Sequence, residues 1–115
     1  NESELISLFK TLEIKSALDQ VKDLCEVIAI TFGEKGSVVI SGSDRWQIKS
    51  YQLGGLIDTT GAGDLYAAGF LHGYVTGKEL KACGQIGSIC SGQIVTQLGS
   101  RSKTDLKKLL NDYLV

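Results

Sequence analysis

The stretch from Asp58 to Asp64, which reads D-T-T-G-A-G-D, constrains the fold of this 115-residue chain more than any other feature. It runs directly into an apolar, helix-like stretch from Leu65 to Val75. Gly61 and Gly63 allow a tight turn and a close approach of the main chain to a ligand, because glycine has no Cβ. A helix that begins after such a turn presents unpaired N–H groups and a partial positive charge. The stretch therefore predicts an anion site suited to a phosphate or a transferring phosphoryl group.

Asp64 places a carboxylate in the first turn of that predicted helix. A carboxylate weakens the binding of anions, so a loop that only held a phosphate would not favour it. A general base that takes a proton from an attacking hydroxyl needs to lie there. The alternative for a G-x-G taken alone is a plain helix start with a favourable first-turn acid. The full string, followed by the small-residue segment from Ala67 to Leu71, is far more specific.

Composition excludes several classes of function. Hydrophobic residues make up 43% and charged residues 22%, which is ordinary for a soluble globular protein. The net charge of −1 argues against nucleic-acid binding and against a membrane-surface patch. No apolar run is long enough to span a bilayer, and no signal-peptide pattern opens the chain. Cys25, Cys83 and Cys90 lack metal-ligand spacing, so we expect reduced, buried thiols in a cytosolic protein.

Hydrophobic periodicity predicts alternating helices and strands. The segment 27–32 is continuously apolar, as for a strand buried on both faces, whereas 44–50 alternates like an edge strand. The helix over 65–75 is apolar nearly all round and is expected to be buried, with His72 in a structural role. The remaining predictions are helices over 2–10, 16–24, 79–97 (ended by Gly99) and 105–114 (capped by Thr104), and a strand over 37–41.

Two shorter patterns allow a structural and a functional interpretation. Asn1 with Glu4 three residues later is typical of a helix capping box. Gly33 to Gly36, between two strands, is explained fully as a hairpin loop. Both patterns nevertheless stand in a fixed order with the longer string, as N-x-x-E, then T-x-G-x-x-G from Thr31, then D-T-T-G-A-G-D.

This series of motifs resembles the ribokinase (PfkB) family of carbohydrate and nucleoside kinases, and the resemblance covers essentially the whole chain. It implies an α/β fold with a three-layer architecture, in which helices flank a mostly parallel sheet. Residues 1–115 would be the C-terminal portion of that domain, without its N-terminal part and lid. The absence of methionine and of a strand before Asn1 leads to the same expectation.

The resemblance also implies roles for individual residues. Asp64 would be the catalytic base, and the N–H groups of Gly61, Ala62 and Gly63 would form the anion hole. Nucleotide contacts would come from Thr31, Gly33 and Gly36, while Asn1 and Glu4 would help to place Mg²⁺ and the phosphates of ATP.

The resemblance also implies a potassium site and an adenine contact. Asp58, with the carbonyls of Thr60 and Gly99, would match part of a potassium site. Equally, Asp58 is a turn acid that bonds the N–H groups of its own loop. Ser88 stands where many relatives place an asparagine against the adenine, and its shorter side chain is a departure from that pattern.

The complete protein is therefore expected to transfer a phosphoryl group from ATP to a hydroxyl of a sugar or nucleoside. The segments that would choose this acceptor are not in the chain, so the 115 residues alone are expected to show no turnover. The string is somewhat closer to the adenosine-kinase-like and general sugar-kinase branches. The alternatives are a non-catalytic nucleotide-binding module and a structural fragment whose sheet edge pairs with another chain. No oligomeric state is predicted.

Overall fold

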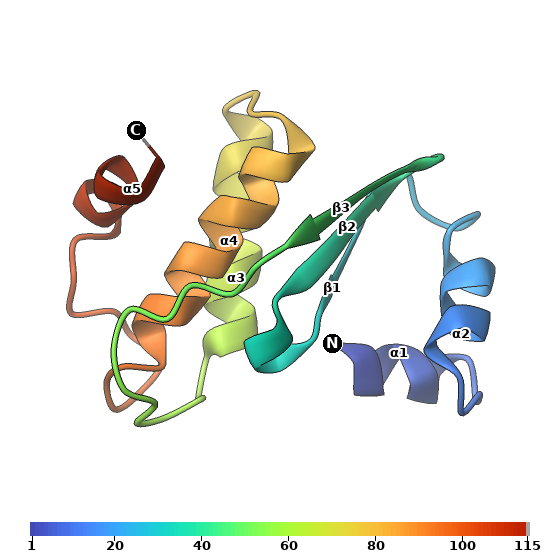
Figure 1. The fold of residues 1–115 in the computed structure, drawn as a ribbon, viewed down its shortest axis with the longest axis horizontal. Coiled ribbons are helices and arrows are strands. Elements are labelled where there is room, and N and C mark those ends of the chain that lie inside the picture. The colour runs from blue at the N-terminus through green and yellow to red at the C-terminus, as the bar shows by residue number, and fades with distance from the viewer. Residues whose placement is uncertain (115) are drawn as a thin grey trace.

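The computed structural model describes residues 1–114. Two short helices open the chain, a small sheet follows, and three helices close it (Figure 1). Among the helices of residues 1–114, none combines the length and the apolar character needed to cross a bilayer. In chain order the elements are α1 (Glu2–Leu8), α2 (Ile14–Val21), β1 (Ile28–Thr31), the 3-10 turn η1 (Gly33–Lys35), β2 (Ser37–Ser41), β3 (Asp44–Ile48), α3 (Ala62–Val75), α4 (Leu80–Ile94) and α5 (Leu106–Leu114).

The sheet has the order β1-β2-β3, and both pairs of neighbours run antiparallel. The parallel strands that the resemblance implies are therefore not among the strands described here. β3 is an edge strand, as its alternating sequence predicts, and Trp46 and Ile48 face the same core. In Figure 1, α1 and α2 lie on one side of the sheet and α3 and α4 on the other, which is a helix–sheet–helix layering.

Each side of the sheet has its own apolar core. Ile28 and Ile30 of β1 pack with Val21 of α2, whereas Val39 of β2 packs with residues of α3 and α4. Antiparallel strands alternate their side chains between the two faces, so neighbouring residues of one strand enter different cores. The sheet therefore connects the N-terminal helix pair to the α3–α4 pair.

Small residues bring α3 and α4 together. A Cβ added to Gly69 would lie 2.9 Å from the carbonyl oxygen of Ile86 and 3.0 Å from Cys90 Sγ. Cys83 and Cys90 are buried in this contact, which confirms the prediction of buried thiols for these two residues. Gly84 of α4 approaches the sheet just as closely, at 2.8 Å from its built Cβ to Ile48 Cγ1. α4 is consequently sandwiched between α3 and the strands.

Burial differs from the sequence prediction in three places. β1 is not buried on both faces, because Ala29 is exposed between Ile28 and Ile30. α3 is not buried all round, since Leu71 is 57% and Val75 78% exposed. Within residues 1–114, other parts of the chain cover only one side of β1 and one side of α3. Both elements nevertheless have apolar residues on their two sides. Cys25 is exposed, not buried, because it follows α2 in an open turn.

Two helix ends also differ. The cap of α5 is Asp105, whose Oδ1 accepts hydrogen bonds from the amides of Lys107 (3.0 Å) and Lys108 (3.2 Å). Thr104 lies one residue before this cap, and its hydroxyl accepts a hydrogen bond from the Gln93 side chain instead. α4 ends at Ile94, so Gly99, with a φ of 85°, belongs to the loop beyond the helix and does not end it.

Candidate active site

The loop that precedes α3 is organised by Asp58. Its Oδ1 accepts hydrogen bonds from the amide (2.9 Å) and the hydroxyl (2.6 Å) of Thr60, and its Oδ2 accepts one from the Gly99 amide (2.9 Å). These bonds, that of the Thr60 hydroxyl foremost, lower the pKa of the Asp58 carboxyl below its ordinary value. Asp58 is therefore an ionised turn acid that accepts a hydrogen bond from the Thr60 amide of its own loop, which confirms one of the two interpretations predicted for it. The same bonds bring Thr60 and Gly99 to this carboxylate.

Gly61 is the residue at which the loop turns into α3. Its φ of 81° is left-handed, and an added Cβ would lie 2.6 Å from Ser100 Cβ. A side chain is excluded here by conformation and by space together. The N-terminus of α3 is thus held against the loop that follows α4.

The amides predicted to form the anion hole are not equivalent. The Ala62 amide donates to the Thr59 carbonyl at 3.1 Å, closing the turn. The amides of Gly61 and Gly63 make no hydrogen bond within the described part of the chain. Unpaired amides at a helix start, reinforced by the helix dipole, attract a negatively charged group.

The turn from Gly33 to Gly36 closes the hairpin of β1 and β2, which confirms the structural interpretation of these glycines. The Phe32 amide donates to the Gly36 carbonyl at 2.8 Å, and Ser50 Oγ donates to the Glu34 carbonyl at 2.7 Å. Gly36 has a φ of 94°, and an added Cβ would overlap the Ile48 carbonyl oxygen. The turn is therefore fixed by contacts on both flanks.

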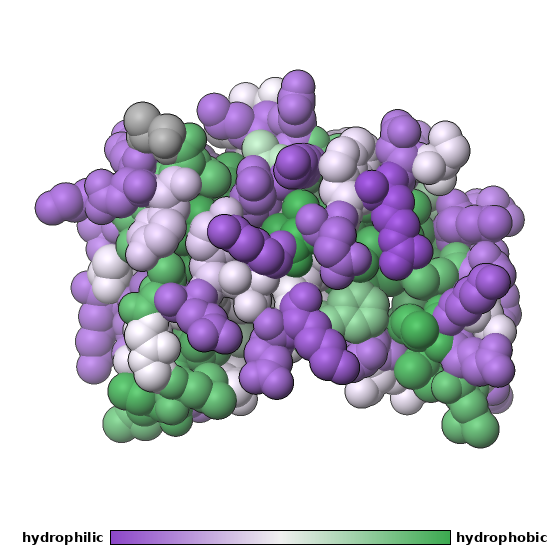
Figure 2. Space-filling view, viewed as in Figure 1, coloured by the Kyte–Doolittle hydropathy of each residue, from purple (hydrophilic) through white to green (hydrophobic). Residues whose placement is uncertain are grey.

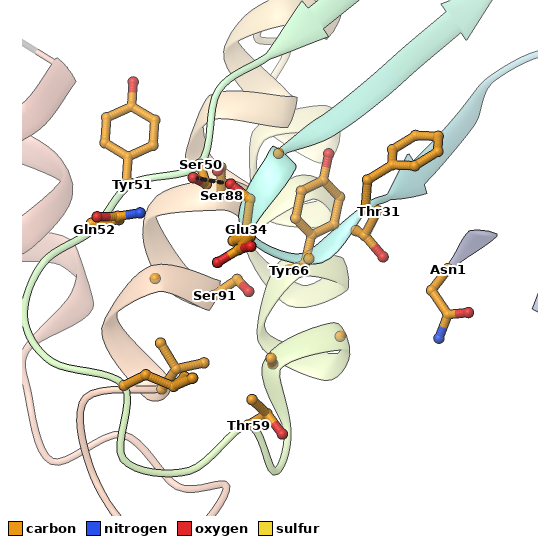
Figure 3. Close-up of a pocket in the computed structure, with 18 of the residues that line it drawn as sticks. Asn1, Thr31, Glu34, Ser50, Tyr51, Gln52, Thr59, Tyr66, Ser88 and Ser91 are labelled. Atoms are coloured by element: carbon orange, nitrogen blue, oxygen red, sulfur yellow. Dashed lines mark hydrogen bonds between the residues drawn. The ribbon is translucent and has the colours of Figure 1, made fainter. Parts of the chain in front are cut away.

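An open hollow of about 770 Å³ lies between this turn and the start of α3 (Figure 3). Ser88 of α4 lies at its wall, is buried, and donates its hydroxyl proton to the Lys49 carbonyl at 2.8 Å. Only the lone pairs of that hydroxyl remain for a ligand. The predicted residues that line this hollow are Asn1, Thr31, Gly33, Gly36, Ala62, Gly63 and Ser88.

A second hollow, of about 590 Å³, adjoins the first and contains Glu4 and Asp64. Asn1, Thr31, Gly63 and Tyr66 line both hollows. Asn1 Oδ1 accepts a hydrogen bond from the Glu4 amide at 2.9 Å, and the main-chain nitrogen of Asn1 donates to Glu4 Oε2 at 2.6 Å, so the predicted capping box is confirmed. Asp64 is exposed in the first turn of α3.

The hollows leave out some predicted residues and add others. Asp58, Thr60, Gly61 and Gly99 line neither hollow, although Gly61 directly precedes Ala62 and Gly63, which do. Sequence reasoning missed further wall residues on α4 and beyond it, although they follow Ser88 at helical spacing. These are Ser91, Gly92 and Val95.

The side chains that could act as metal ligands are spread over the described residues. No group of three or more His, Cys, Asp or Glu side chains able to hold a metal comes together within residues 1–114. Mg²⁺ in phosphoryl-transfer sites is bound by one or two carboxylates and by the phosphates of the substrate. Glu4, on the wall of the second hollow, offers a carboxylate of that kind.

Comparisons with known protein families and solved structures identify relatives of this chain. Residues 1–107 match the pfkB family of carbohydrate kinases. A nucleoside kinase of Methanocaldococcus jannaschii is 36% identical over 102 residues, which are 89% of this chain and 32% of that protein. A crystal structure of nucleoside kinase from the same organism, described as an archaeal member of the ribokinase family, is 34% identical with a TM-score of 0.72, over 87% of this chain and 32% of that one.

Two other crystal structures extend the comparison. Adenosine kinase from Sinorhizobium meliloti is 37% identical with a TM-score of 0.94, over 98% of this chain and 35% of that one. Fructokinase from Vibrio cholerae, crystallised with fructose, ADP and calcium, is 25% identical with a TM-score of 0.78, over 86% of this chain and 34% of that one. The chain thus spans about a third of the length of these relatives.

The likeness of fold and the match over residues 1–107 lead to one conclusion. The described strands and helices are part of a ribokinase-like α/β fold, and the chain belongs to the pfkB family of carbohydrate kinases.

Proposed function

We propose that the complete protein transfers the γ-phosphoryl group of ATP to a hydroxyl of a sugar or nucleoside. In this proposal residues 1–115 are the C-terminal portion of the kinase domain and supply the nucleotide site, the anion hole and the base. One observation carries it: the Gly33–Gly36 turn and the start of α3 are two walls of one hollow, and Asp64 lies in the adjoining one. Turnover would need the remainder of the protein, since the chain spans about a third of its relatives.

The size and the chemistry of the hollows fit this role. A volume of about 770 Å³ lies within the range of small-molecule sites, roughly 300–1,000 Å³. The free amides of Gly61 and Gly63 would stabilise the charge that develops on the transferring group. Asp64, one residue after Gly63, would accept the proton of the attacking hydroxyl. Thr31, Gly33, Gly36 and Ser88 would contact the nucleotide from the opposite walls.

Two ions would complete the site. Mg²⁺ would be held by the phosphates and by Glu4, aided by Asn1, and would neutralise phosphate charge. K⁺ would be held by Asp58 with the carbonyls of Thr60 and Gly99. Asp58 retains capacity for this, because two carboxylate oxygens offer about four lone-pair sites and three are used. A fructokinase of similar fold was crystallised with fructose, ADP and a calcium ion, which supports a nucleotide and a cation as ligands of the complete protein.

The acceptor is proposed at the level of class. Two of the relatives are a nucleoside kinase and an adenosine kinase, so nucleosides are the first acceptors to assay, followed by sugars. The three free cysteines support a cytosolic location, where thiols stay reduced.

Replacing the proposed base tests this function in the complete protein. Asp64→Asn keeps the size of the side chain and removes its basic oxygen, so kcat should fall by about 10²–10⁴-fold. The affinity for ATP should hold or improve, because a negative charge beside the phosphates is removed. Asp112→Asn, an exposed change on α5, is the matched control and should leave kcat unchanged.

The outcome separates three interpretations. A large loss of kcat with retained ATP affinity supports catalysis by Asp64. Nucleotide binding by a wild-type protein that phosphorylates no sugar or nucleoside would support a non-catalytic binding module. Near-wild-type turnover of Asp64→Asn would reduce Asp64 to a helix-start acid and contradict the proposal.

A further inference from the structure

One buried hydrogen bond crosses from the start of α3 to the sheet. The Tyr66 hydroxyl lies 2.7 Å from Ser37 Oγ, and the two residues are 6% and 1% exposed. Within residues 1–114 it is the only hydrogen bond that joins α3 to a strand. Figure 3 shows Tyr66 projecting from α3 toward the strands, with the hydroxyl at the far end of its ring.

The position of this pair relates it to both sides of the site. Ser37 directly follows Gly36, the last residue of the turn, and begins β2. Tyr66 follows Asp64 by two residues and lines both hollows. Besides this bond, α3 is joined to the strands by the apolar core that Tyr66 and Phe70 share with Val39 and Ile48, and through α4, which contacts both. The pair thus directly connects the Gly33–Gly36 turn, the proposed nucleotide turn, with the helix that carries the proposed anion hole and base.

The ring of Tyr66 is held independently of its hydroxyl. It stacks on Phe70 with a centroid distance of 6.3 Å and an interplanar angle of 23°. A Cβ added to Gly87 would lie 3.2 Å from the ring and 2.8 Å from the Tyr66 carbonyl. Packing alone would therefore be satisfied by phenylalanine, and a buried hydroxyl costs free energy unless it is paired. Burial raises the pKa of the Tyr66 hydroxyl, which therefore stays protonated, and either hydroxyl of the pair can be the donor.

We propose that Tyr66 and Ser37 are positioning residues that fix the nucleotide turn relative to the anion hole. This inference rests on the proposed function of those two loops. A phosphoryl-transfer site depends on holding the nucleotide and the stabilising amides in register. A single short, buried bond between the walls limits how far they separate.

The test uses three variants of the complete protein: Tyr66→Phe, Ser37→Ala and the double variant. The thermal midpoint, the Kd for ADP, and the hydrogen-exchange rates of two amides are measured for each. These amides are those of Gly36, which donates to Gly33 in the turn, and of Leu65, which donates to Gly61 at the helix start. Tyr113→Phe, a change of an exposed tyrosine on α5, is the control.

Each single variant leaves one buried hydroxyl without its partner and should lower the thermal midpoint, whereas the double variant should recover most of that loss. All three variants should weaken ADP binding by about threefold to tenfold, the factor that one net hydrogen bond represents. All three should also accelerate exchange at both amides. The control should change none of these quantities.

A merely structural role predicts a different result for the double variant. If Kd and both exchange rates return to wild-type values together with the thermal midpoint, the positioning role is refuted. If the wild-type protein binds no ADP, the proposed function fails. The exchange rates of Gly36 and Leu65 then still decide whether the pair couples the two loops.

Discussion

Replacing Gly61 by alanine separates two effects that the structure assigns to this residue. Gly61 has a left-handed φ of 81°, and an added Cβ would lie 2.6 Å from Ser100 Cβ and 3.0 Å from Ser100 Cα. Gly77, at the other end of α3, has nearly the same φ of 77°, but its added Cβ would meet nothing within 4 Å. Gly77→Ala is therefore a matched control that carries the conformational cost without the steric one.

The expected magnitudes follow from this difference. A left-handed conformation costs an L-residue with a side chain about 1–2 kcal/mol, and both variants bear this cost. Forcing an extra methyl group against Ser100 adds a steric cost of about 1–3 kcal/mol at Gly61 alone. Gly61→Ala should thus destabilise the protein by about 2–5 kcal/mol and Gly77→Ala by about 1–2 kcal/mol.

Denaturant unfolding of the complete protein measures these losses, and ADP titration measures the effect on the site. Displacement of the α3 start should weaken ADP binding in Gly61→Ala and leave it unchanged in Gly77→Ala. Adding Ser100→Gly to Gly61→Ala removes the nearest contact. It should recover part of the stability that Gly61→Ala loses beyond the loss of Gly77→Ala. Equal free-energy losses for the two alanine variants would refute the close approach of Gly61 and Ser100.

Three further predictions concern the ions and thiols. At equal ionic strength the activity of the complete protein should be higher in KCl than in NaCl; equal activities would count against the potassium site. Of the cysteines, the exposed Cys25 should react first with a thiol reagent. Cys83 and Cys90, whose pKa values are raised by burial, should be labelled only on unfolding, as peptide mapping would show. Because the pKa of Asp58 is lowered in the fold, its stabilisation should be complete above the ordinary carboxyl value and lost as pH falls through the lower folded value. Asp58→Asn should remove this acid dependence from unfolding curves, and an unchanged curve would contradict it.

Local sequence is enough to predict most elements of this chain. The helices and strands occur within a few residues of the predicted bounds, because hydrophobic periodicity and glycine turns act over short distances. Burial was predicted less well, since it depends on what covers an element. Ala29 and Leu71 belong to apolar segments, yet both are exposed where residues 1–114 bring no partner to them. Figure 2 likewise shows apolar groups at the surface of the molecule, and the exposed side chains include Leu56, Ile57 and Leu98.

What the sequence by itself determined is the chemistry available to the site: a glycine turn before a helix, a carboxylate at its start and a second glycine turn in a hairpin. These follow from backbone freedom and helix dipoles, which are local properties. Only the tertiary structure decided that Asp58 bonds the amide of Gly99 and that Tyr66 bonds Ser37. Such pairs join residues 41 and 29 positions apart. Which partner a polar side chain finds at that range depends on how α3, α4 and the strands pack, and no local pattern encodes that packing.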